Sequence, residues 1–379
     1  MKRLVCVVAL LLITVPAWSA KNVTLAELTD MLKTLHQANK SDADVAAALK
    51  QVQMTEELTR EKMNDVAEFV PGQLSTEQLY VLEARSAMMP PPPAAIPPAA
   101  APDAAAQKAI LDKADDYAAK TYDQLPALTA SKATRRFQDN VEAVAPAAGK
   151  RSSANAEVSP YQFVHFLNST TADIVSEHGI ERPAAKDKTV WGPNKMIGIQ
   201  EPDPSLNEVY KEAKDAGSIK WLRWQMVAGT QVAVFAFDVP KKKSHLTVNI
   251  CCFPNPSSPS ETGVARNTSD SVPANDVIWH NYKSVLPYHG QFFIDPGTGT
   301  VVRMIAQADL KSSEVVHQQD TRIDYGTVTV GGKPLVLPVK TVIDTEVVPN
   351  GDVSPGSTSE RTTLFTAEYS NYQPAGGAK

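Results

Sequence analysis

Apolar and charged positions in residues 21–88 follow one another with the period of an α-helix. Four such segments are predicted, each following a residue that can cap a helix: Thr24, Ser41, Thr55 and Ser75. Each segment has one apolar stripe and one charged face, so the stripes must pack on one another or on a partner. The pattern therefore predicts a small helical bundle over residues 21–88.

A stretch rich in proline and alanine, residues 89–103, interrupts this pattern. Such runs favour extended polyproline II structure, so we expect a linker between two domains. Asp103 is predicted to cap a long helix, after which the period of the apolar positions changes to two. One more helix, capped by Ser205 and ended by Gly217, is predicted among the strands.

The strands that follow alternate apolar and polar side chains, and turn-forming residues such as Gly331 and Gly332 separate them. One buried face and one hydrated face are typical of a single curved sheet or an open barrel. We therefore predict an α+β protein: the helical bundle, the linker, and a curved antiparallel β half-barrel over residues 104–373 with one or two helices against it. Residues 374–379 are expected to form a tail.

The first 20 residues have the pattern of a secretory signal peptide. Lys2 and Arg3 precede an apolar run from Leu4 to Val15, and small residues near Ala20 offer a cleavage site. The run is too short to span a bilayer, and no later stretch is apolar enough to do so. We expect an exported protein, periplasmic or extracellular in a bacterium, with no transmembrane segment after cleavage.

The cysteine content adds little chemistry, because only Cys251 and Cys252 follow the predicted signal peptide. Adjacent residues of a strand point to opposite faces, which disfavours an ordinary bridge between them. Two half-buried apolar thiols are the simplest interpretation. A vicinal disulfide and an intermolecular bridge are the alternatives.

Net charge and motifs narrow the function. A formal charge of −5 without a basic block argues against nucleic acid as a partner. No serine-hydrolase elbow, zinc-protease motif, phosphate-binding loop or Cys-x-x-Cys pair is present. We therefore expect no catalytic residues, no metal and no cofactor. The weaker alternative is a metal held by His280 and His289 with Asp276.

Two tryptophans in one predicted strand, Trp221 and Trp224, are expected to point to opposite faces. One would then lie in the core, and the other would be free to stack on a sugar or a lipid. Arg223 is expected on the same face as Trp221. Simple packing of the indoles is the favoured interpretation, and stacking on a ligand is the alternative.

Two stretches carry a resemblance to a known fold. Residues 118–137 form a predicted amphipathic helix that runs into a strand ending in Arg135, Arg136 and Phe137, and residues 290–303 form a predicted hairpin. Both are similar to parts of the outer-membrane lipoprotein carrier (LolA) fold, which the periplasmic regulator RseB shares. Nearly the whole chain also resembles a group of exported proteins of Acidobacteria. The carrier resemblance covers residues 105–373 and implies a half-open barrel whose concave face holds acyl chains.

Three functions are carried forward. The first is a non-enzymatic envelope protein whose half-barrel binds an apolar ligand, such as a lipid or a lipoprotein acyl chain. The ligand would contact side chains on apolar strand faces: Trp221, Phe235, Phe237, Val302, Met304, Leu337, Val339 and Phe365. The second is an interaction or sensor protein that docks an envelope partner through residues 21–88. The third is an enzyme with a loop-borne site around His280 and His289.

Overall fold

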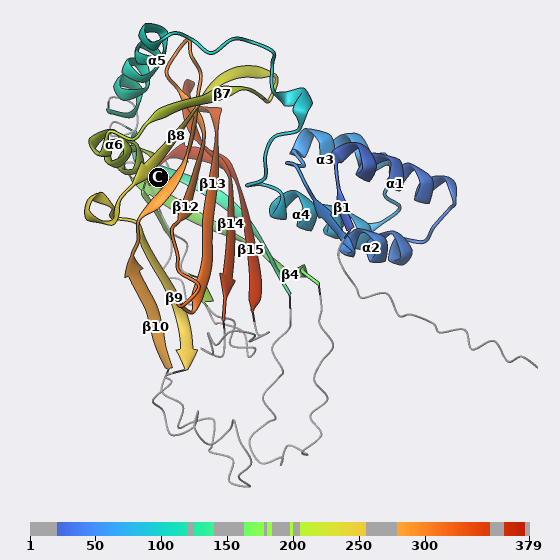
Figure 1. The fold of residues 1–379 in the computed structure, drawn as a ribbon. Helices are drawn as coiled ribbons and strands as arrows, with labels where there is room; N and C mark the ends of the chain where they lie inside the picture. The colour runs from blue at the N-terminus through green and yellow to red at the C-terminus, as the bar shows by residue number, and fades with distance from the viewer. Residues whose placement is uncertain are drawn as a thin grey trace, which may run out of the picture.

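The computed structural model describes residues 21–119, 125–139, 163–177, 180–183, 198–199, 205–254, 279–348 and 360–375. Within these ranges the protein is α+β, with six α-helices and a large antiparallel sheet that does not close into a barrel (Figure 1). The predicted signal peptide, residues 1–20, lies outside the described residues.

The N-terminal region, residues 21–88, has four helices and a short parallel pair of strands. Its elements are β1 (Lys21–Val23), α1 (Leu25–Gln37), α2 (Asp42–Lys50), β2 (Val52–Met54), α3 (Arg60–Val66) and α4 (Gln73–Arg85). Their apolar stripes share one buried cluster, which includes Leu28, Leu32, Val45, Leu49, Met63 and Leu79. The caps predicted at Thr24 and Ser41 are confirmed.

The other two predicted helix starts in this region are wrong. Thr55 continues the β1–β2 pairing, since its amide donates to the Val23 carbonyl at 2.9 Å, and Thr59 caps α3 instead. α4 begins at Gln73, so Ser75 lies inside the helix. The amides of Leu74 and Ser75 donate to the carboxylate of Asp42, at 3.0 and 2.9 Å. A side chain from α2 therefore caps α4, which a local motif cannot reveal.

The main sheet has ten strands in the order β5-β4-β3-β15-β14-β13-β12-β11-β8-β7. Their bounds are β3 (Leu128–Gln138), β4 (His165–Glu177), β5 (Ile180–Pro183), β7 (Lys220–Val227), β8 (Thr230–Val239), β11 (Tyr288–Ile294), β12 (Val301–Ala308), β13 (Val316–Val330), β14 (Lys333–Val347) and β15 (Arg361–Pro374). A smaller sheet pairs β10 (Trp279–Val285), β9 (Thr247–Pro254) and β6 (Gly198–Ile199). Cys251 and Cys252 lie on β9, and their side chains are outside the described part.

Helices α5 (Ala104–Tyr117) and α6 (Leu206–Ala216) pack on one face of the main sheet, which we call the inner face (Figure 1). Asp103 caps α5, Ser205 caps α6, and Gly217 ends α6 in the left-handed conformation, as predicted. The buried side chains between these helices and the sheet form the inner layer, which includes Ile110, Ala114, Leu206, Val209, Tyr210, Phe235, Phe237 and Phe292.

The N-terminal region covers the opposite, outer face (Figure 1). Val81, Ala84 and Ala87, on and just after α4, pack against buried side chains of the sheet: Phe137, Val342 and Leu364. Residues 89–103 then run past β7, where the Trp224 indole donates to the Ala100 carbonyl at 2.8 Å. The proline- and alanine-rich stretch thus connects the outer face to α5 on the inner face around the β7 edge of the sheet.

Candidate functional site

Five of the eight residues predicted to bind an apolar ligand meet in or against the inner layer: Trp221, Phe235, Phe237, Met304 and Leu337. Phe235 and Phe237 are fully buried, and the Phe237 ring stacks on Phe292 with centroids 4.3 Å apart. Tyr210 of α6 lies against the same Phe292 ring, at 5.2 Å. In the described part of the inner face, side chains of α5 and α6 occupy the space beside these residues.

The other three predicted residues lie elsewhere. Val302 is an extra residue in a β-bulge, because Val301 and Arg303 pair with consecutive residues of β11. It packs on the outer face with Val232, Val234 and Phe293. Val339 is likewise skipped where the β13–β14 register shifts. Phe365 belongs to a separate cluster with Ile343 and Ala367.

The expectation that the two tryptophans point to opposite faces is wrong for the same reason, whereas simple packing of both indoles is confirmed. The β7–β8 register skips Leu222, which leaves Leu222 43% exposed and turns Arg223 over. Trp221 and Trp224 therefore lie on one face, with ring centroids 4.9 Å apart, and both pack against the inner layer. Arg223 points to the other face and donates to the side-chain oxygens of Gln225 and Gln291. A bulge re-aims the side chains that follow it.

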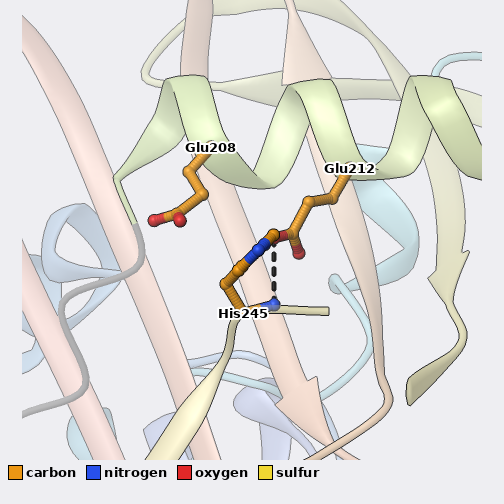
Figure 2. Close-up of side chains that lie close together, drawn as sticks. All are labelled: Glu208, Glu212 and His245. Carbon is orange, nitrogen blue, oxygen red and sulfur yellow. Dashed lines mark hydrogen bonds and ion pairs between the residues drawn. The ribbon is translucent and has the colours of Figure 1, made fainter. Parts of the chain in front are cut away.

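A cluster of three metal-ligating side chains stands beside the inner layer (Figure 2). Glu208 and Glu212 are one turn apart on α6, and His245 approaches from the segment before β9. Glu212 is buried, whereas Glu208 and His245 are exposed. Tyr288 donates its hydroxyl to Glu212 Oε2 at 2.6 Å. His245 donates its amide to Glu212 Oε1 at 3.0 Å and pairs its Nδ1 with the same oxygen.

The cluster combines the carboxylate and imidazole donors that divalent metals accept. Glu212, however, already has a protein donor on each oxygen, and these bonds explain the geometry without an ion. Its hydrogen bond and charge raise the pKa of His245. Burial, and then Glu212, raise the pKa of Tyr288. The arrangement ties α6 to β11 and to the start of β9.

Of the residues predicted to form a loop-borne site, only the side chain of His289 lies within the described residues. His289 pairs with Asp309, with Nδ1 2.7 Å from a carboxylate oxygen. The side chain of His280 and the whole of Asp276 lie outside the described residues. A metal site at these residues stays a prediction.

The contact between the N-terminal region and the outer face, which we call the seam, contains a buried ionic network. Glu57 lies 2.6 Å from Arg322 and 3.3 Å from Arg303. Asp324 contacts the same two arginines, at 2.5 Å from Arg303 and 3.0 Å from Arg322. Burial alone would raise the pKa of Asp324, but the two guanidiniums outweigh it and hold the pKa well below its usual range.

A second group of charges extends the seam. Glu83 of α4 pairs with Lys340 of β14 at 2.5 Å and with Arg60 at 2.9 Å. Glu368 of β15 pairs with Arg60 at 2.7 Å and with Arg135 at 3.1 Å. Burial lowers the pKa of Lys340, although Glu83 opposes the shift. The N-terminal region thus supplies carboxylates that meet basic side chains of the sheet.

A cavity of about 290 Å³ opens beside this network. Its walls come from Glu57, from residues 87–91 and Ile96, and from three strands of the sheet, β7, β11 and β12. The strand residues are Arg223, Gln225, Gln291, Phe293, Arg303 and Ile305. Neither the cavity nor the role of Glu57 was predicted from the sequence. The polar residues of β12–β14 alternate as they do on a hydrated sheet face, so they give no signal of a partner.

Comparison of the chain with known protein families, with curated proteins and with solved structures gives no match. The resemblance to the lipoprotein carrier fold therefore stays a prediction. In the part of the chain that the structure describes, none of the helices has both the length and the apolarity to cross a membrane.

Proposed function

We propose that this chain is a non-enzymatic binding protein of the bacterial envelope that holds its ligand in the seam cavity. The proposal rests on the observation that three parts of the chain form the walls of the cavity. The N-terminal region, the proline- and alanine-rich stretch and the main sheet each contribute lining residues. A ligand there contacts all three parts of the molecule at once.

In this proposal residues 21–88 form a small helical bundle and residues 89–103 are the linker that fixes it to the sheet. Glu57 and Arg303 both line the cavity and also belong to the buried ionic network. A ligand that contacts them stabilises the seam by its own binding free energy, because it binds the docked arrangement and not an undocked one. Ligand binding would then change how stably the N-terminal region docks on the sheet.

Native mass spectrometry of the mature chain, residues 21–379, purified from a periplasm without detergent, tests the proposal. We expect a bound mass that is lost on denaturation. Ile96 lines the cavity and is 45% exposed, so Ile96→Trp should fill the cavity mouth without disturbing a core. The matched control is Leu74→Trp on α4, which is 53% exposed and does not line the cavity.

The expected result is loss of the bound mass in Ile96→Trp and its retention in Leu74→Trp. A mature chain that carries no ligand and takes up none from a metabolite mixture would contradict the proposal. So would a ligand whose binding Ile96→Trp leaves unchanged.

The inner layer supports a second candidate, the apolar ligand expected from the sequence. The specific observation is Tyr117, whose hydroxyl is buried in that layer with no hydrogen-bond partner among the described residues. A polar group on a lipid acyl chain could satisfy it if α5 moved. A bound fatty acid or lipopeptide that survives in Ile96→Trp would favour this candidate over the seam cavity.

A further inference from the structure

Arg223 differs from the other basic residues beside the seam cavity. Arg303, Arg322 and Lys340 each have a carboxylate within hydrogen-bond distance. Arg223 has none among the described residues. Its Nε and Nη2 donate to Gln225 Oε1 at 2.9 and 2.6 Å, and Nη2 also donates to Gln291 Oε1 at 3.1 Å. No acceptor for Nη1 lies in the described part of the chain.

The backbone and its neighbours hold this guanidinium in place. The bulge at Leu222 turns Arg223 to the outer face, where the cavity lies. Gln225 is buried and fixes one edge of the guanidinium by two hydrogen bonds. The guanidinium carbon also lies 5.9 Å from the centroid of the Phe293 ring. An arginine held by amide oxygens keeps its full charge, and its remaining N–H groups stay available.

The local charges leave one positive charge without compensation. The negative charges of Glu57 and Asp324 offset the positive charges of Arg303 and Arg322. The positive charge of Arg223 has no such counterpart among the described residues. Burial, together with the charge of Arg303, lowers the pKa of Arg223, although Glu57 acts in the opposite direction. A partly buried cation without an anion is unfavourable. An anionic group in the cavity would relieve that cost.

We propose that the seam cavity binds a small organic monocarboxylate, with its carboxylate on Arg223 and its apolar part against Met88, Ile96 and Ile305. This rests on the proposed function. A carboxylate can accept charge-assisted hydrogen bonds from the free N–H groups of Arg223 Nη1, and about 290 Å³ is at the small end of ligand sites. A dianion such as phosphate fits less well, because only one charge among the described lining residues is uncompensated and the Glu57 carboxylate also lines the cavity.

The test measures binding of hexanoate, hexanamide, hexanol and inorganic phosphate to the mature chain by calorimetry. We expect one site for hexanoate, at least about tenfold weaker binding of the two neutral analogues and of phosphate, and weakening by added salt. Arg223→Gln should weaken hexanoate binding about tenfold or more, because a charge-assisted pair is lost. Lys220→Gln removes the same charge from an exposed position of the same strand and should leave binding unchanged.

Thermal unfolding of each variant checks that it is folded, and Ile96→Trp provides a second block that leaves Arg223 intact. Hexanamide or phosphate bound as well as hexanoate, or hexanoate binding unchanged in Arg223→Gln, would overturn the monocarboxylate inference. If the mature chain still carries a ligand that Ile96→Trp removes, the proposed function survives that result. If no ligand responds to Ile96→Trp, both fail.

Discussion

Asp344 and Asp320 lie opposite each other on β14 and β13, so two carboxyl groups face each other across the outer face of the sheet. Asp320 accepts hydrogen bonds from Gln307 and Gln318, at 2.8 and 3.0 Å. Asp344 Oδ1 is buried with no hydrogen-bond partner among the described residues. Burial, then Asp320 and Glu346, raise the pKa of Asp344 to about 8, and burial raises the pKa of Asp320 to about 6.

The raised pKa of Asp344 predicts how stability changes with pH. The folded state holds this proton more tightly than the unfolded state, so the free energy of unfolding falls as pH rises from about 4 to about 8. Asp344→Asn mimics the protonated form. We expect it to be near neutral at pH 4 and to stabilise the protein by about 2 kcal/mol at pH 9.

Urea unfolding at pH 4, 7 and 9 measures this difference. The matched control is Asp30→Asn, which removes a carboxyl group from the exposed side of α1, away from this buried pair. A loss of stability at alkaline pH that Asp344→Asn leaves in place would show that another group causes it.

At the scale of elements, the hydrophobic periodicity of the sequence predicted well which segments are helices and which are strands. It predicted less well which face of the sheet each strand side chain lies on. Alternation places Val302 with Met304 and Trp221 opposite Trp224. Bulges in β12 and β7 reverse both relations. A bulge adds one residue to one strand only, so its position depends on the partner strand and is not written in the local pattern. The candidate site was missed for this reason, since the β7 bulge is what turns Arg223 toward the cavity.

The β11–β12 turn gives a prediction about how α5 is held on the sheet. Gly299 has a φ of +77°, and a Cβ there would lie 2.4 Å from the carbonyl of Lys113 in α5. Gly299→Ala should therefore cost about 2–4 kcal/mol, from backbone strain and from displacement of the helix. Gly217→Ala has a similar φ of +67° but open space around its Cβ, so it should cost about 1 kcal/mol.

Urea unfolding of the two alanine variants measures the difference, which isolates the contact between the turn and α5. Equal losses in the free energy of unfolding of both variants would mean that the close contact between the turn and α5 adds nothing to the cost of the substitution.

At the scale of the whole molecule, the sequence predicted a hydrated polar face, and the structure covers part of that face with the N-terminal region. The alternating pattern places Arg303, Asp324 and Lys340 on a polar face of the sheet, but it does not identify the residues that contact them. The N-terminal partners of Arg303 and Lys340, which are Glu57 and Glu83, lie more than 200 residues earlier in the chain. Such long-range charge pairing leaves no local pattern, so the seam could not be predicted.

The seam itself can be tested by removing one charge. Glu57→Gln leaves Arg322 and Arg303 with one carboxylate between them and should cost about 3–5 kcal/mol. Lys62→Gln breaks an exposed pair with Asp65 and should cost less than about 1 kcal/mol. Limited proteolysis should then cut the proline- and alanine-rich stretch faster in Glu57→Gln. An unchanged cleavage rate together with unchanged stability would mean that the network does not hold the N-terminal region.

The distance along the chain between the two sides of the seam also orders the events of folding. Glu57 precedes Arg322 by 265 residues, so the N-terminal region is synthesised long before the strands that receive it. Its docking must be a late step, because contacts of this separation form after the local ones. Interactions that form late slow unfolding more than they speed folding. The buried charges of the seam would therefore act chiefly by slowing the undocking of the N-terminal region, and so would set how long the folded protein stays closed.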